Sequence, residues 1–189
     1  MSEELTIGEV YRAQMVLLDV ARALRANPVD SIGVDILLTD LEDSGTDGDD
    51  TSWCLGTQKW VENMPYTDGN LPVYGILLDM VGGKNATFYK EQFSQRTAGK
   101  YVNKIWNTAH RLGFGNFFPK EKGTEVTDDH MYVYNLRQIP CVDIINYDPN
   151  CDTGFGDFWH TIDDTMDIID KGTLNAVGQT LLEVIYNEK

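Results

Sequence analysis

Hydrophobic residues follow two patterns along this chain, and each pattern predicts one kind of element. Short unbroken apolar runs, Val34–Leu38, Val73–Leu78 and Cys141–Ile145, are typical of buried strands. Between them, apolar residues recur at helical spacing, and Asn27-Pro28 ends the first such stretch. Helices are expected over residues 10–24, 55–63, 89–112, 128–136 and 174–186, with a bend near residue 99 in the third.

The order of these elements predicts an α/β fold. Strands that alternate with helices form a mostly parallel, layered sheet. The 189 residues are enough for one domain with its own core, and we treat residues 1–189 as a single unit. In such sheets the ligand site lies just beyond the carboxyl ends of the strands, so the residues found there matter most.

Acids and one histidine follow the three predicted strands. Glu42 and Asp43 come after the first, Asp79 ends the second, and His160 follows the third through a loop. Carboxylates and imidazole are zinc ligands, and a catalytic zinc has about three protein ligands and one open position. Neighbouring side chains point apart, so one of the paired acids can bind metal while the other moves protons. The other interpretation is a solvated acidic loop over residues 40–50.

Composition narrows the possible functions. The net charge of −15 leaves no basic surface for phosphates, which argues against nucleic-acid binding. No apolar stretch is long enough to span a membrane, and no signal peptide is evident. Cys141 lies in an apolar run and is expected to be buried, while Cys54 and Cys151 have the option of pairing in an oxidising compartment.

Four short motifs in order resemble the zinc aminopeptidase and glutaminyl cyclase superfamily, metallopeptidase family 28. The family's D-x-E-E appears as residues 40–43, its L-D-x-x-G includes Asp79, and its D-D-H is residues 128–130. The cyclase pattern F-x-x-x-W-H-T-x-D-D appears as residues 155–164. The resemblance runs from about Val16 to the C-terminus. It implies a three-layer sandwich: a mostly parallel twisted sheet with helices on both faces, lacking the N-terminal part of the domain.

The resemblance also implies a role for each polar residue. Glu42 would be the general acid/base, and Asp43 and His160 would be zinc ligands. Asp79 and Asp128 would belong to a hydrogen-bond network beside the substrate. Aspartate replaces the commoner glutamate at position 43; it is shorter, but it can still bind zinc.

Aromatic residues would form the pocket for the substrate's glutamine side chain. Phe155 and Trp159 occupy the matching positions of the cyclase pattern, and Trp53, in the loop after the paired acids, is a further candidate. The Trp159-His160 pair favours a cyclase over an aminopeptidase.

The chain departs from the family pattern in its N-terminal part. Relatives have an earlier H-x-D segment and a further ligand aspartate, which small residues follow, and neither motif occurs here. Alignment through the first helix places Glu9 at the ligand position, but Val10 and Tyr11 replace the small residues. Chance placement of an acid in a chain this acidic is the other interpretation, and the one we favour.

These features predict a zinc-dependent glutaminyl-peptide cyclotransferase that converts the N-terminal glutamine of a peptide into pyroglutamate and ammonia. One alternative is a zinc aminopeptidase of the same superfamily. Another is an inactive, truncated relative that serves as a binding module. The expected partner is a peptide with an N-terminal glutamine, and a periplasmic or secreted location is expected for the full-length relative.

Overall fold

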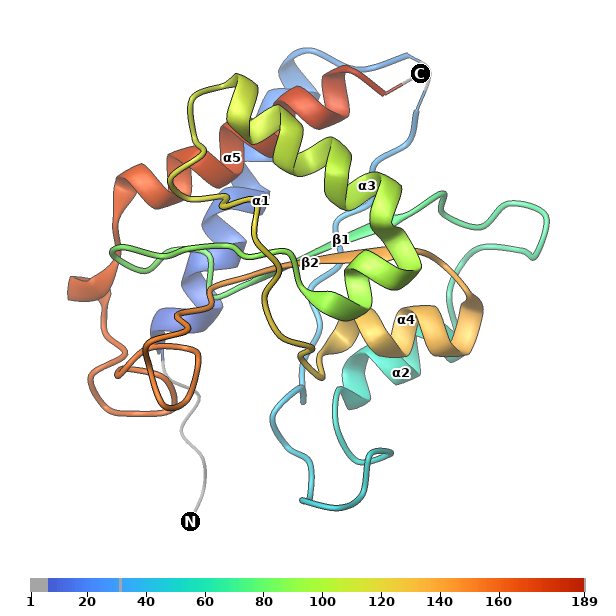
Figure 1. Cartoon of the computed structure of the whole chain (residues 1–189). Coiled ribbons are helices and arrows are strands. Elements are labelled where there is room, and N and C mark those ends of the chain that lie inside the picture. The colour runs from blue at the N-terminus through green and yellow to red at the C-terminus, as the bar shows by residue number, and fades with distance from the viewer. Residues whose placement is uncertain (1–6, 31, 189) are drawn as a thin grey trace.

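The computed structural model describes residues 7–30 and 32–188, and in these ranges the sheet has two parallel strands (Figure 1). Strand β1 is Gly75–Asp79 and strand β2 is Cys141–Ile145. The register pairs Gly75 with Cys141 and Asp79 with Ile145. Because the strands run in the same direction, their carboxyl ends meet at one edge of the sheet.

All five predicted helices are present. They are α1 (Ile7–Ala26), α2 (Leu55–Glu62), α3 (Gln92–Arg111), α4 (Asp129–Arg137) and α5 (Lys171–Tyr186), with a short 3₁₀ helix at Met166–Ile168. The bend expected near residue 99 falls at Ala98, whose backbone leaves the helical region at φ −130° and ψ 21°.

The helices surround the two strands. In Figure 1, α3 and α5 lie above the strands, and α4 and α2 lie below them. Helix α5 packs against α1 and α3, while α4 contacts both strands and α2. The core includes Val142 and Ile144 from β2 and Ile105 and Trp106 from α3, all at most 1% exposed. This arrangement is the expected α/β fold, a parallel sheet covered by helices.

The prediction of a strand at Val34–Thr39 is wrong. Residues 32–40 have no regular secondary structure, and the side chain of Leu38 is 61% exposed. Val34, Ile36 and Leu37 are each about 40% exposed. A strand needs a hydrogen-bonded neighbour, and among the described residues no segment pairs with this one.

Two other sequence expectations concern cysteines and membranes. Cys54, Cys141 and Cys151 are all free thiols, so Cys54 and Cys151 do not pair. Cys141 is buried, as expected. Within the described part of the chain, none of the helices has the length and apolar character needed to cross a bilayer.

Candidate active site

The acidic turn after residue 39 is attached to the start of helix α2. The backbone carbonyls of residues 40–42 accept hydrogen bonds from the backbone N–H groups of residues 54–56, at 3.0–3.2 Å. These contacts satisfy N–H groups at the start of α2 that would otherwise lack partners. Gly56 permits the close approach, since a Cβ there would lie 2.4 Å from the carbonyl oxygen of Asp40. The position of Glu42 and Asp43 is therefore set by α2.

Glu42 lies in an unusually acidic, half-buried environment. Its Oε1 atom is 4.0 Å from the Sγ atom of Cys54. Burial, with the negative charges of Asp128 and Asp43, raises the pKa of Glu42 to about 10. A raised pKa makes the Glu42 carboxylate a stronger base, which suits a residue that takes a proton from a substrate and passes it on.

Asp43 and His160 converge although 117 positions of sequence separate them. The Oδ2 atom of Asp43 lies 3.3 Å from Nε2 of His160, and the two side chains are 39% and 44% exposed. A carboxylate oxygen and an imidazole nitrogen that face each other in an accessible place fit two ligand positions of a zinc site. The third candidate, Glu9, lies in α1, but its side chain is outside the described residues.

The loop that carries His160 is anchored to the loop after β1. The N–H of Asp170 donates to the carbonyl of Gly82, and that of Lys84 donates to the carbonyl of Ile168, each at 2.9 Å. The side-chain amide of Asn146, which follows β2, donates to the carbonyl of Phe155 at 3.2 Å. These contacts hold residues 155–170 at the carboxyl ends of the strands.

Two of the three predicted pocket aromatics extend from His160 in a row of packed rings. The Trp159 ring stacks on the imidazole at a centroid distance of 4.1 Å, and Phe155 lies 5.0 Å from Trp159. Trp53 packs tightly on Gly45, where a Cβ would lie 2.0 Å from its ring. Trp53 therefore covers the loop that begins at the paired acids.

Asp79 and Asp128 come from different elements. Asp79 is the last residue of β1, and Asp128 caps the start of α4 by accepting from the N–H of Asp129. Burial, followed by the charges of Asp143 and Asp79, raises the pKa of Asp128 well above its usual range. Asp128 in turn raises the pKa of Glu42, so the two carboxyl groups are electrostatically linked.

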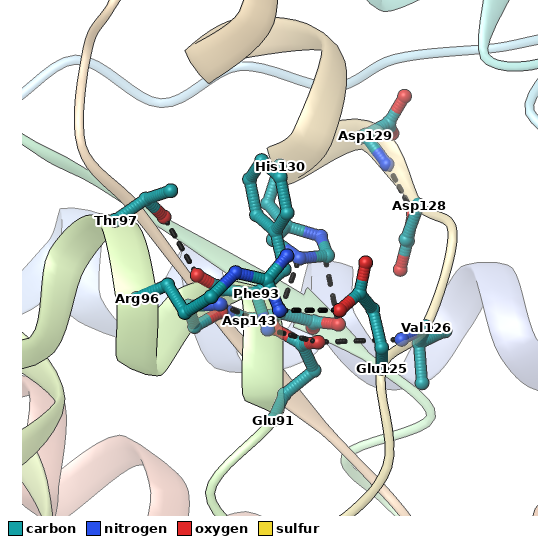
Figure 2. Close-up of polar contacts among 11 residues, drawn as sticks. Glu91, Phe93, Arg96, Thr97, Glu125, Val126, Asp128, Asp129, His130 and Asp143 are labelled. Atoms are coloured by element: carbon teal, nitrogen blue, oxygen red, sulfur yellow. Dashed lines mark hydrogen bonds and ion pairs between the residues drawn. The ribbon is translucent and has the colours of Figure 1, made fainter.

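Sequence reasoning missed two members of a buried cluster behind Asp128, namely Glu91 and Asp143 (Figure 2). Both contact His130, a fully buried residue whose Nε2 atom is hydrogen-bonded to Glu91. Asp143 had a detectable signal, because it is the one charged residue in the apolar run Cys141–Ile145. Glu91 is a helix cap that pattern alone does not distinguish from a surface acid.

Two groups of side chains have spacing compatible with a bound ion. They are Glu42, Cys54 and Asp128, and Asp128, His130 and Asp143. All members of the second group are buried, so an ion there would have no open position for a substrate. The accessible Asp43–His160 pair is better suited to catalysis.

Comparisons with known proteins match both the sequence and the fold of this chain. Residues 13–185 match peptidase family M28. A Zn-dependent exopeptidase from Parabacteroides distasonis is 49% identical, with a TM-score of 0.85 over 92% of this chain and 60% of that one. Tannerella forsythia glutaminyl cyclase is 48% identical, with a TM-score of 0.86 over 92% of this chain and 61% of that one.

A third solved structure is a leucine aminopeptidase precursor from Bacteroides thetaiotaomicron. It is 44% identical, with a TM-score of 0.84 over 92% of this chain and 59% of that one. This chain thus spans about three-fifths of the length of each of these three structures. Among curated proteins, nothing matches. The match over residues 13–185 means that the chain belongs to peptidase family M28.

Proposed function

We propose that this domain contributes to a glutaminyl-peptide cyclotransferase, which converts an N-terminal glutamine into pyroglutamate and releases ammonia. The observation that carries the proposal is the Asp43–His160 pair. The His160 ring stacks on Trp159, and Asp43 follows Glu42 directly in the sequence. Relatives with the same architecture include the Tannerella forsythia glutaminyl cyclase.

Asp43 and His160 would hold a zinc ion, with Glu9 as the candidate third ligand. A bound zinc ion would act as a Lewis acid toward the side-chain amide carbonyl of the substrate. The donor set supports this assignment, because a carboxylate and an imidazole converge to 3.3 Å in an accessible position.

The residues of the chain would supply binding and proton transfer. Trp159 and Phe155 would pack on the glutamine side chain and exclude water from it. The α-amino group of the peptide attacks the side-chain amide carbon, the ring closes, and the carbon–nitrogen bond to the departing amide breaks. Glu42 would take the proton from the attacking amine and deliver it to the leaving nitrogen as ammonia forms.

A zinc aminopeptidase is the second candidate, since one close structural relative is a leucine aminopeptidase precursor. In that case Glu42 would activate water and the product would be a free amino acid. The third candidate is a binding module without catalysis.

Metal analysis combined with an assay on a glutaminyl peptide separates the three candidates. A cyclase releases ammonia, and Glu42→Gln should abolish that release while bound zinc is retained. Glu62→Gln is the matched control, because this glutamate is exposed on α2 and pairs with Lys59. Release of a free amino acid would instead support the aminopeptidase. A protein that has neither activity and binds no zinc would contradict both catalytic assignments.

A second measurement tests the candidate third ligand. Glu9→Ala should weaken zinc binding if Glu9 occupies the missing ligand position. Unchanged zinc affinity in the variant would remove Glu9 from the site.

A further inference from the structure

The buried acid Asp143 lies at the centre of strand β2, where an apolar residue would be expected. Its side chain is 0% exposed, and both carboxyl oxygens lack a hydrogen-bond partner among the described residues. The Nδ1 atom of His130, 3.7 Å from one of these oxygens, is buried and has no hydrogen-bond partner in the same part of the chain. Unpaired buried polar atoms are rare in folded proteins, and a bound ion is one arrangement that accounts for them.

Glu91 holds His130 in the orientation of a metal-binding histidine (Figure 2). The Nε2 atom of His130 is 3.1 Å from Oε2 of Glu91. Glu91 also accepts hydrogen bonds from the N–H groups of Phe93 and Ser94, at 2.7 and 2.6 Å. A carboxylate with these donors is ionised, so the hydrogen on Nε2 points to Glu91 and the lone pair of Nδ1 faces Asp143. Histidines that bind metal typically donate their other ring N–H to a carboxylate in this way.

The distance between His130 and Asp143 suits two ligands of one ion better than a hydrogen bond. At 3.7 Å, Nδ1 and Oδ2 are too far apart for a hydrogen bond. Zinc bonds of about 2.1 Å at tetrahedral angles place two ligand atoms about 3.4 Å apart. An acceptor nitrogen and a carboxylate that face each other also repel, unless a cation or a proton lies between them.

Asp128 supplies a third ligand from a different element. It caps the start of α4, His130 lies in the first turn of that helix, and Asp143 lies in β2. One atom from each of the three lies within 4.8 Å of the others, so a small inward shift of the side chains would close them on an ion. With both oxygens of Asp143 the set has four donor atoms, the number of a closed zinc site.

The electrostatic surroundings also favour a cation. Burial raises the pKa of Asp143 well above its usual range, and the charges of Asp79 and Glu91 raise it further. Burial raises the pKa of Asp128 in the same direction, followed by the charge of Asp143. A divalent ion would inject positive charge here and let the buried carboxylates stay ionised.

We propose that Asp128, His130 and Asp143 hold a buried divalent transition-metal ion, with zinc as the best match, at a structural site separate from Asp43 and His160. Imidazole together with carboxylates suits zinc, whereas calcium and magnesium take oxygen ligands. All three ligands are buried, so the ion would leave no open position for a substrate and would instead tie α4 to β2. The proposal does not depend on the cyclotransferase activity.

Zinc counting in a His160→Ala background tests the proposal, because that variant lacks one ligand of the accessible pair. The protein is produced with zinc in the medium and dialysed against metal-free buffer. Elemental analysis should find one zinc ion per chain, and adding His130→Asn should remove it. His110→Asn is the matched control and should leave the count unchanged, since His110 is a part-buried histidine whose Nε2 atom lies 2.8 Å from the carbonyl oxygen of Phe118.

Zinc affinity, measured by competition with a chelator, gives a second test that keeps all three ligands. In the same His160→Ala background, Glu91→Gln weakens only the support behind His130, so it should raise the Kd for zinc about 10- to 100-fold. Glu125→Gln, which removes an exposed acid, is its control and should leave the Kd unchanged. Removal of the ion by excess chelator should lower the Tm of His160→Ala, because an ion that binds only the folded state stabilises it.

Three results would overturn the proposal. One is a His160→Ala protein that is folded by circular dichroism but contains no zinc. Another is bound zinc that both His130→Asn and Asp143→Asn leave in place, since the ion would then lie elsewhere. The third is a Tm of His160→Ala that does not respond to chelator, which would mean that protons rather than an ion neutralise the buried carboxyl groups.

The outcomes for this site and for the proposed function are separable. If His160→Ala keeps its zinc but the wild type releases no ammonia, the cyclotransferase assignment fails and the buried site stands. If the wild type releases ammonia but His160→Ala contains no zinc, the buried site fails and the cyclotransferase assignment stands.

Discussion

Two apolar segments of this protein have similar sequences and very different environments. Strand β2, Cys141–Ile145, is buried along its whole length, and Ile144 is 0% exposed. Residues 34–38 are equally apolar, yet none of their side chains is buried. Strand β2 has β1 as its hydrogen-bonded neighbour and helices α3 and α4 against it, whereas the earlier segment has no partner strand among the described residues. An apolar run therefore becomes a buried strand only where a neighbour is available.

The largest expected difference between these segments is in stability. Ile144→Ala should lower the free energy of unfolding by about 2–5 kcal/mol, because it opens a cavity in a closed core. Leu38→Ala should change it by less than about 0.5 kcal/mol, because little of that side chain is removed from water. Denaturant unfolding of the two variants measures both values. A cost for Leu38→Ala close to that of Ile144→Ala would mean that residues 34–38 are buried in solution.

The same contrast explains which parts of the fold were predictable. The helices were located correctly because their periodicity is local. Strands β1 and β2 were located correctly because the two apolar runs pair with each other. The failure at Val34–Thr39 has a non-local cause: strand formation depends on a pairing segment, which periodicity does not reveal.

The candidate site was predictable to a similar degree. The sequence order of the motifs placed Asp43 and His160 together, and the structure brings them to 3.3 Å. The Glu91–His130–Asp143 cluster was not predicted, because it depends on a contact between the start of α3, the start of α4 and the middle of β2. Only packing brings these three positions together.

A smaller difference in the free energy of unfolding is expected between removal of a buried hydrogen-bonded acid and removal of an exposed one. Glu91→Gln should destabilise the protein by about 1–3 kcal/mol, because a buried charged hydrogen bond to His130 is lost. Asp35→Asn, in the exposed segment, is the control. Asp35 accepts a hydrogen bond from Tyr66, but both groups are in contact with water and the cost should stay below about 0.5 kcal/mol.

The pH dependence of the Glu91→Gln effect has a definite sign. Burial alone would raise the pKa of Glu91, but the hydrogen bond and charge of His130, with two backbone N–H donors, lower it from 4.5 to about 2. A lowered pKa stabilises the folded state above the unfolded value, and that contribution disappears as pH falls from about 4.5 toward 2. The gap between wild type and Glu91→Gln should therefore be widest above about pH 4.5 and should narrow below it. A gap that widens in acid would show that Glu91 is not an ionised acceptor.

The smallest effect on stability is expected from introducing a charged residue into the exposed segment, residues 34–38. The same substitution should have a measurable effect on surface properties. Leu38→Lys should leave the free energy of unfolding within about 0.5 kcal/mol of wild type, because Leu38 contributes little to the core. It should nevertheless reduce binding of a hydrophobic dye and concentration-dependent association, since residues 34–38 are mostly apolar and exposed, and their backbone has no partner strand among the described residues. Val73→Lys is the control, because Val73 is 74% exposed but lies outside that stretch. Equal loss of dye binding in the two variants would mean that any exposed apolar side chain binds the dye, and that residues 34–38 have no special role.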